Sequence, residues 1–496
     1  MNFNSVDYLI FFPIVVLLYF VMPVKLRNLW LLFASYFFYM HWNVAYGLLL
    51  FSSSAVTYAA GLLIEKAKAF YEVNEAGKVS RLILILDLVF NLGLLFFFKY
   101  ANFMIGNINR ISALFGGGNI RSLDILLPVG ISFYIFQALG YTIDVYRNEV
   151  KAEKNIITYM LFVSFFPQLV AGPIERSKNL LPQFKVKHEF DVDRVREGLF
   201  IMATGLFMKI MIADNIATYV DAVYENYMGY TGAEIMLATI LFAFQIYCDF
   251  GGYSAIAIGS AKVLGFNLME NFHSPYLATS IRGFWRRWHI SLTGWFRDYL
   301  YIPLGGNRKG KIRKHINTFI VFFISGMWHG AAWNYIAWGV INGIYLIVEE
   351  LSEPLRNKIM DKCRVDKTRF SFKLGSGLLT FALVDLSWLF FRARGIGNAF
   401  SILKQMITAF QGAQFFGLAF NRTGFSVQLT VALIVAFILL LIADVLKEKG
   451  TDLWQVVNKQ GAWFRWGVYL LILFMIMMYG AYGLEYAQTE FIYFQF

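Results

Sequence analysis

A single histidine lies inside one of the most apolar parts of this chain. Residues 323–339 read FISGMWHGAAWNYIAWG, and His329 is the only side chain among them that titrates near neutral pH. A neutral imidazole can take a proton from a hydroxyl group and return it to a leaving group, which is general acid–base catalysis. Inside a membrane, an ionisable side chain is by default a candidate functional residue. We therefore predict a catalytic role for His329, with a packed, hydrogen-bonded imidazole as the alternative.

A second histidine, His289, lies in the most charged part of the sequence, residues 281–314. The stretch IRGFWRRWHISLTGWFRDYLYIPLGG has apolar residues at helical spacing and arginines on the other side, which predicts an amphipathic helix in the membrane interface. His289 falls on the apolar side, where it either hydrogen-bonds a carbonyl group or lies at the cytoplasmic mouth of a buried pathway. The arginines either determine topology or, at Arg286, Arg287 and Arg297, bind the phosphates of a nucleotide-bearing donor.

The composition assigns the chain to the polytopic membrane proteins. It has 496 residues, 58% hydrophobic and 15% charged, and its net charge of +12 comes from loops between apolar runs, so nucleic acid is not an expected partner. Two distant cysteines make neither a disulfide framework nor a metal site. We predict an all-α fold, a single membrane domain over residues 1–496 with about 11–13 membrane helices or re-entrant segments. The apolar segments are 6–22, 29–40, 44–63, 82–99, 125–142, 156–172, 198–213, 235–258, 316–329, 331–348, 375–391, 425–443 and 466–483.

The positions of charges and prolines indicate the topology. Loops 64–81 and 349–373 are basic, which places them in the cytoplasm, whereas 214–234 carries only acidic charges and belongs outside. Two prolines in FFPQLVAGPIERS make 156–172 the best candidate for a re-entrant segment, since proline removes backbone donors. Both termini then face outward, and residues 6–22 form a retained first span because no basic region precedes them.

The hairpin that carries His329 is too short for two full, straight spans. Its 316–348 stretch has two glycines and an asparagine near the midpoint, which weaken a helix there. Fourteen residues of helix from His315 advance about 21 Å, so His329 is expected roughly two-thirds of the way across a ~30 Å hydrocarbon layer. Four other ionisable side chains fall in apolar segments and have less claim to function: Asp87, Lys209, Asp249 and Asp385. They are candidates for paired structural charges between helices, and we predict that role for Asp87.

Five long motifs resemble the membrane-bound O-acyltransferase (MBOAT) family, and within it the bacterial branch that acts in alginate O-acetylation. They are PVGISFYIFQALGYTIDVYR, FFPQLVAGPIER, QIYCDFGGYSAIAIGSAKVLGF, FWRRWHISLTGWFRDYLYIPLGGNR and GMWHGAAWNYIAWG, and the similarity extends to the closing FIYFQF. The resemblance implies a ring of helices with a thin, tunnel-bearing centre. His329 matches the nearly invariant histidine of the family, and His289 matches its second polar position. Ala255 and Asn342 depart from the family pattern, which leaves substrate specificity open.

The resemblance also implies a reaction and its partners. An acyl group, expected to be acetyl from acetyl-CoA or another thioester, passes from the cytoplasm to an extracytoplasmic acceptor, with no tightly bound cofactor and no metal. The expected acceptor is a polysaccharide or a partner protein resembling an SGNH hydrolase, and the expected location is the bacterial cytoplasmic membrane. The expected tunnel-lining residues are Trp285, Trp328, Trp333, Asn334 and Asp249, with the role of Asp249 open.

Three alternatives remain at this point. A secondary transporter would use the intramembrane charges, but such proteins often repeat a broken helix in two halves, and only one broken hairpin is found. A non-catalytic scaffold of a polysaccharide export complex predicts that His329 can be lost without consequence. A D-alanyl transferase acting on teichoic acid is the rival within the enzyme class, and the long extension beyond WHGAAW favours acetyl transfer.

Overall fold

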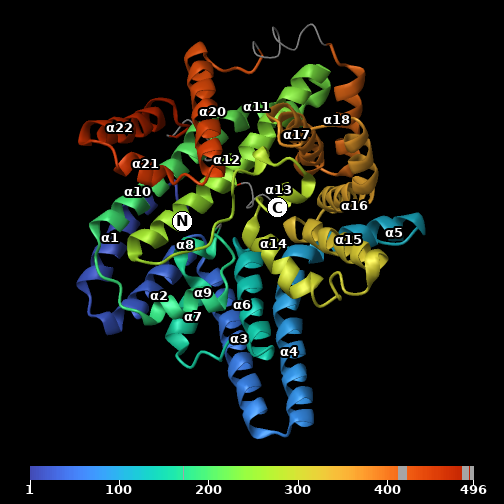
Figure 1. Ribbon diagram of the computed structural model, residues 1–496. Coiled ribbons are helices and arrows are strands. Elements are labelled where there is room, and N and C mark those ends of the chain that lie inside the picture. The colour runs from blue at the N-terminus through green and yellow to red at the C-terminus, as the bar shows by residue number, and fades with distance from the viewer. Residues whose placement is uncertain (171, 412–421, 483–490, 492–496) are drawn as a thin grey trace. The chain divides into compact units, whose positions relative to one another are not determined.

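The computed structural model describes residues 1–170, 172–411, 422–482 and 491 (Figure 1). Throughout these ranges the regular elements are helices, which confirms the predicted all-α membrane class. Of the closing FIYFQF motif, only Phe491 lies within the described residues. The chain forms two compact units, residues 1–202 with 256–269 and residues 203–255 with 270–496.

The first unit contains the N-terminal helices. Within it α3 and α4 form a long antiparallel hairpin, and α5 turns away from the axis of α4 after a π-helical segment, η1 (Figure 1). Its elements are α1 Val6–Val21, α2 Val24–Met40, α3 Val44–Phe70, α4 Val73–Leu95, η1 Phe96–Tyr100, α5 Ala101–Leu114, α6 Ile131–Tyr146, α7 Ile156–Ser164, α8 Phe166–Leu169, α9 Ser177–Leu180 and η2 Leu181–Lys185, and α10 Val192–Leu206 begins in this unit.

The membrane-facing hairpin of this unit is held together by buried polar side chains. Ser53 Oγ donates to Asn91 Oδ1 across α3 and α4 at 2.6 Å, and Asn91 Nδ2 donates to Asp87 Oδ1 at 2.9 Å. Asp87 was predicted to be a paired structural charge between helices, whereas these bonds join its carboxylate to the amide of Asn91 on the same helix. The predicted re-entrant stretch 156–172 forms α7 and α8, two buried helices that are each too short to cross a bilayer.

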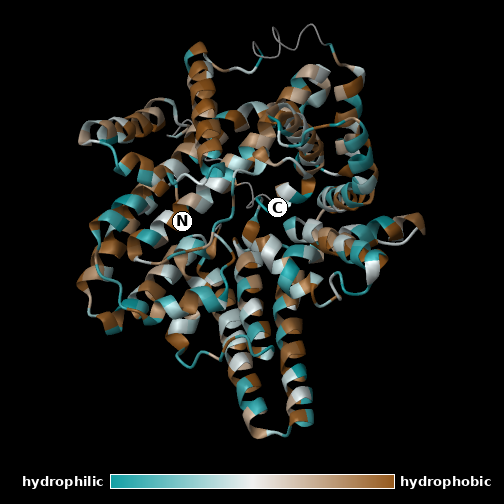
Figure 2. Ribbon diagram, in the orientation of Figure 1, coloured by the Kyte–Doolittle hydropathy of each residue, from teal (hydrophilic) through white to brown (hydrophobic). Residues whose placement is uncertain are grey.

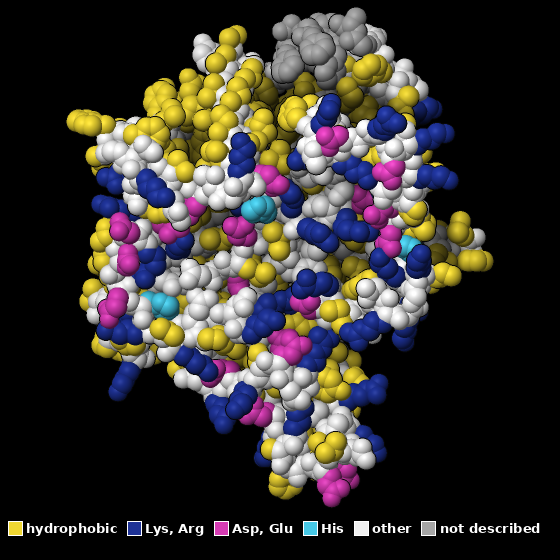
Figure 3. Space-filling model, viewed as in Figure 1, with side chains coloured by type: hydrophobic (Ala, Val, Ile, Leu, Met, Phe, Trp, Pro, Cys, Tyr) yellow, Lys and Arg dark blue, Asp and Glu magenta, His cyan; other side chains and the backbone are white. Residues whose placement is uncertain are grey.

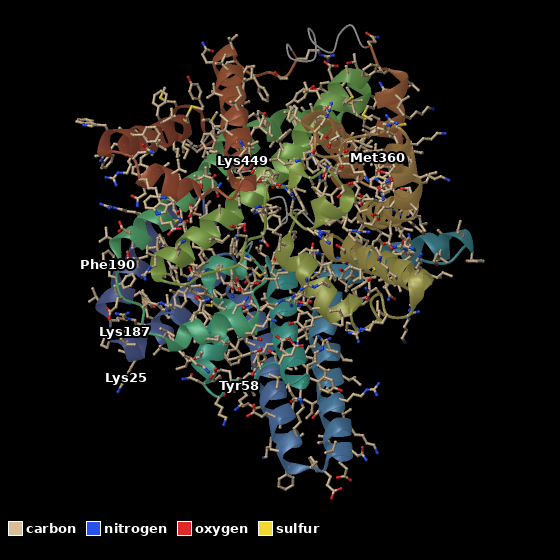
Figure 4. The ribbon with its side chains drawn as sticks, viewed as in Figure 1. Lys25, Tyr58, Lys187, Phe190, Met360 and Lys449 are labelled. Atoms are coloured by element: carbon tan, nitrogen blue, oxygen red, sulfur yellow. The ribbon has the colours of Figure 1, made fainter. Side chains whose placement is uncertain are left out.

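The second unit contains the remaining helices. Its elements are η3 Phe207–Ala213, α11 Asp214–Glu225, η4 Tyr227–Gly229, α12 Gly232–Leu264 (which ends in the first unit), η5 Pro275–Leu277, α13 Ile281–Trp285, α14 Ile290–Phe296, η6 Arg297–Tyr301, α15 Gly310–His329, α16 Trp333–Lys362, α17 Phe370–Arg392, α18 Ile396–Thr408, α20 Val427–Glu448, α21 Leu453–Asn458 and α22 Ala462–Tyr479. Met360, near the C-terminal end of α16, and Lys449, just after α20, are labelled in Figure 4.

Within the described residues, seven helical stretches are long and apolar enough to cross a membrane. They are Val44–Phe70, Val73–Leu114, Val192–Glu225, Gly232–Leu264, Phe370–Arg392, Val427–Glu448 and Ala462–Tyr479. The ribbons of α20 and α22 are almost entirely apolar (Figure 2), and apolar side chains gather over both helices (Figure 3). Exposed apolar surface of this extent is expected where a helix faces lipid, so the chain is a multi-pass membrane protein.

The amphipathic stretch that begins at residue 281 differs from the prediction. We expected one continuous helix in the membrane interface, but the chain forms α13 and α14 with a break between them. The side chains of Trp288 and Phe296 are buried within the protein. The prediction of an interfacial helix was therefore wrong for this apolar face, because helical spacing identifies the side that is buried but not whether protein or lipid covers it.

Candidate active site

The hairpin of α15 and α16 is held together by glycines. A Cβ atom added to Gly339 would lie 2.3 Å from the carbonyl oxygen of Phe322, and one added to Gly326 would lie 2.5 Å from that of Tyr335. The two helices therefore approach backbone to backbone, as small residues allow in membrane proteins. Helix α15 ends at His329, and Gly330 continues in an extended conformation. The predicted break near the middle of 316–348 is confirmed.

His329 is surrounded by aromatic rings. Its side chain is only 3% exposed. The imidazole centroid lies 5.0 Å from the ring of Trp328, 4.9 Å from that of Trp338 and 5.5 Å from that of Phe391, and all three pairs are edge-to-face. This enclosure draws on α15, α16 and α17, so three helices fix the orientation of the imidazole.

His289, which matches the family's second polar position, lies beside His329. The two imidazole centroids are 6.5 Å apart, and His289 also packs edge-to-face on Phe250 at 4.7 Å and on Trp328 at 5.9 Å. Both histidines are buried, His289 to 1% exposure. The second unit therefore brings together two imidazoles that are 40 positions apart in the sequence.

The backbone at His289 has an unusual conformation. Its φ of +43° lies in the left-handed region, which a non-glycine residue occupies at a cost of about 1–2 kcal/mol. Asn271 holds the following turn in place, because its carbonyl accepts from the Ile290 amide at 2.9 Å and its Oδ1 accepts from Ser291 Oγ at 2.6 Å. Strain that is held by specific hydrogen bonds is common at functional sites.

The aromatic enclosure extends beyond the residues predicted from the sequence. The rings of Trp338 and Trp388 are stacked with centroids 5.6 Å apart, and Trp285 packs edge-to-face on Trp338 at 5.7 Å. Trp285 and Trp328 were predicted to line the site, and both contact one of its central rings. Trp388 and Phe391 were missed, because they lie on α17 and helical spacing within one segment does not identify the partner helix.

The other predicted lining residues differ from one another in burial and in the groups that they contact. Asn334 is buried, and its Nδ2 lies 3.5 Å from the Phe391 carbonyl oxygen. Asp249 is buried on α12, where it makes an ion pair with Lys209. Trp333, at the start of α16, is 45% exposed. Its role as a lining residue stays a prediction.

The three predicted donor-binding arginines have different environments. Arg287 donates to Glu448 through both terminal nitrogens, and Arg297 Nε donates to Asp298 Oδ1 at 2.8 Å. Arg286 is exposed. These ion pairs show that Arg287 and Arg297 hold local structure, whereas Arg286 has its charge at the surface. On the nearby start of α15, a hydrogen bond from Lys314 lowers the pKa of Glu350.

Comparisons with known proteins identify the family to which the sequence is similar. The profile of the membrane-bound O-acyltransferase family matches residues 146–367, which include both histidines. A peptidoglycan O-acetyltransferase of Helicobacter pylori is 36% identical over 80% of this chain and 78% of its own. A probable alginate O-acetylase of Pseudomonas aeruginosa is 37% identical over 82% of this chain and 74% of its own. A teichoic acid D-alanyltransferase of Bacillus subtilis is 28% identical over 46% of this chain and 60% of its own.

Proposed function

Because this chain belongs to the MBOAT family, and is thus a membrane O-acyltransferase, we propose that it passes acetyl groups to an extracytoplasmic polysaccharide or peptidoglycan acceptor. The observation that carries the proposal is the buried pair of imidazoles, with centroids 6.5 Å apart, inside an aromatic enclosure. The names of the two relatives that match most of this chain support O-acetylation over D-alanyl transfer, because two teichoic acid D-alanyltransferases match only 46% and 53% of it, at 28% and 27% identity.

In this proposal His329 acts as the general base. The acceptor hydroxyl gives its proton to the His329 imidazole while its oxygen forms a bond to the carbonyl carbon of the thioester. The C–S bond of the tetrahedral intermediate then breaks, and the proton passes from the imidazolium to the departing thiolate. The products are an O-acyl ester and a free thiol, so atoms and charge balance without a further reactant.

His289 has a second role in the proposal. The separation of the two rings suits a reacting oxygen atom that lies between them and is hydrogen-bonded to either one. The left-handed backbone and the Asn271 hydrogen bonds hold His289 in that position before substrate arrives. Such preorganisation lowers the barrier because no rearrangement is needed during the reaction.

The donor and partners are proposed from the surroundings of the site. Bulky rings enclose His329 on several sides, which suits a small acyl group such as acetyl. The donor is a cytoplasmic thioester such as acetyl-CoA, with Arg286 as the exposed arginine that binds its phosphates. An extracytoplasmic partner protein resembling an SGNH hydrolase is proposed to carry the group onward, and the cytoplasmic membrane of a bacterium is the proposed location.

The test measures the acetyl content of cell-surface polysaccharide and peptidoglycan in a deletion strain. The strain is complemented with wild type, His329→Ala or His315→Ala at matched membrane levels. His315 is the matched control, because it lies on the same helix, α15, but outside the aromatic enclosure. We expect wild type and His315→Ala to restore acetylation and His329→Ala to lose it. Full acetylation with His329→Ala would refute general-base catalysis by His329 and favour a scaffold role.

A further inference from the structure

A buried cluster of three charged side chains lies in the second unit, on η3, α11 and α12. Lys209 Nζ is 2.7 Å from Asp214 Oδ1 and 2.7 Å from Asp249 Oδ1, and the three side chains are between 1% and 5% exposed. We call these three residues the charge triad. Removing charges from water in this way is costly, and an apolar replacement of similar size is often at least as stable. The triad is therefore a candidate for a role other than holding the helices together.

The local backbone keeps the charge triad in the packed interior. Lys209 lies on η3, a π-helical segment, and such segments occur frequently at functional sites. A Cβ atom added to Gly252 of α12 would lie 2.6 Å from the Gly205 carbonyl oxygen and 3.1 Å from the Lys209 amide nitrogen. The Lys209 ammonium also lies 5.6 Å from the ring centroid of Tyr253. Helix α12 is thus pressed against the segment that carries the lysine.

Asp249 connects the charge triad to the two histidines. It directly precedes Phe250, whose ring packs on His289 at 4.7 Å, and His289 lies 6.5 Å from His329 between ring centroids. Charges act over longer distances in a packed, apolar interior than in water, because the effective dielectric constant is lower. A change of charge at Asp249 is therefore expected to be felt by both imidazoles.

We propose that Asp249, held by Lys209, is an electrostatic positioning residue whose negative charge stabilises the imidazolium formed during acyl transfer. The inference rests on the proposed role of the two histidines. When the acceptor proton moves to the imidazole, a positive charge appears there, and a fixed negative charge nearby lowers its energy without rearrangement. Asp249 touches neither substrate nor the reacting atoms and acts only through its field.

Other titratable groups on the surrounding helices also contribute to the field at the histidines. They are Tyr247 and Tyr253 on α12, Tyr335 on α16, and Asp385 and Arg392 on α17, where Arg392 makes an ion pair with Asp221. These groups are the same in all the variants compared below. Differences between variants therefore report the charge triad alone.

The experiment measures the titration of the histidines by NMR on the purified full chain in lipid nanodiscs, with labelled histidine. The chain has six histidines, and the signals of His289 and His329 are assigned from His289→Gln and His329→Gln. We expect Asp249→Asn to move the titration midpoint of His329 to lower pH, by about half to one pH unit for a unit charge removed at an assumed separation of about 10–20 Å with an effective dielectric constant of about 20. Lys209→Met removes a positive charge and is expected to move the midpoint to higher pH.

Two further variants distinguish the field of Asp249 from a purely structural effect. Asp249→Glu keeps the charge and is expected to keep the wild-type midpoint. Glu234→Gln removes another buried carboxylate of α12, about 22 Å along the helix from Asp249, and is expected to leave the midpoint unchanged. If Lys209→Met fails to fold, the comparison of Asp249→Asn with Glu234→Gln still decides the question.

The inference is overturned if Asp249→Asn and Glu234→Gln leave the His329 midpoint equally unchanged, or if Asp249→Asn and Lys209→Met move it in the same direction. Because this readout needs no substrate, it is separate from the acetylation test. Full acetylation with His329→Ala in that test, together with opposite shifts here, would overturn the proposed function while leaving the electrostatic coupling. Acetylation that depends on His329, with no shift here, would overturn only the role of Asp249.

Discussion

The close contact between α15 and α16 makes Gly339 a sensitive position. In Gly339→Ala the new methyl group would start 2.3 Å from the Phe322 carbonyl oxygen and 3.0 Å from the Gly326 Cα atom, so the helices must separate locally by about 1 Å to reach normal van der Waals distances. Overpacking of this kind typically costs about 1–3 kcal/mol. Trp338 is the neighbour of Gly339 in the sequence and packs on His329 at 4.9 Å, so the displacement is transmitted to the imidazole.

Gly343→Ala is the matched control for this prediction, because Gly343 lies one turn further along α16. There the nearest atom is the Phe322 Cβ at 3.2 Å, which a shift of a few tenths of an ångström relieves. We expect Gly339→Ala to lower the free energy of unfolding by about 2 kcal/mol and acetylation up to about 100-fold, since misplacement by 1 Å can cost that much. Gly343→Ala should stay close to wild type.

The assay is thermal unfolding of the purified protein in detergent, followed by tryptophan fluorescence, together with surface acetylation in complemented cells at matched protein levels. Equal stability and activity of Gly339→Ala and Gly343→Ala would refute the backbone contact as the element that positions Trp338. A loss of stability in Gly339→Ala with full activity would show that the position of Trp338 does not govern the reaction.

Two further predictions concern charges outside the membrane-spanning helices. Burial raises the pKa of Glu175 from 4.5 to about 7 in the folded protein. The folded state therefore binds this proton more tightly than the unfolded state, which stabilises the fold fully below pH 4.5. This stabilisation is lost as the pH rises through 7. Thermal unfolding measured between pH 5 and 8 should therefore show the free energy of unfolding of wild type falling by on the order of 2 kcal/mol. The decline should be weaker in Glu175→Gln. An equal decline with pH in the two proteins would contradict this prediction. Arg286→Ala should raise the KM for acetyl-CoA severalfold without changing the free energy of unfolding. Arg287→Ala breaks the ion pair with Glu448 and should lower the free energy of unfolding by up to about 1 kcal/mol. An unchanged KM in Arg286→Ala, measured by thiol release from acetyl-CoA, would exclude the proposed phosphate contact.

The sequence was most informative where local chemistry determines structure. The break between α15 and α16 follows from glycine and asparagine near the midpoint of the hairpin, and it appears at Gly330 as expected. The family motifs also singled out His329 and His289, which the structure brings within 6.5 Å of each other. Neither result required knowledge of which helices pack together.

The parts that could not be predicted depend on contacts between distant segments. Trp388 and Phe391 lie on α17, and nothing in their own segment indicates that Phe391 packs on His329 or that Trp388 packs on Trp338. The left-handed turn at His289 interrupts a stretch whose apolar spacing continues without a break, and it depends on Asn271, which lies on a different segment. Helical spacing describes one face of one helix, so it cannot register a turn that another segment holds in place.

The sequence displays local chemical signals but not contacts between distant segments. For this reason the two histidines were recognised, whereas most of the environment that determines their reactivity was not. An imidazole in an apolar hairpin is a chemical signal that the sequence displays directly. Its reactivity depends on what surrounds it, here aromatic rings from three helices and a strained turn held by Asn271. Substitutions at Gly339 and Asn271 retain both histidines in the sequence and alter only the positions of their imidazoles. They therefore test whether the arrangement, rather than the presence of two histidines, determines the rate.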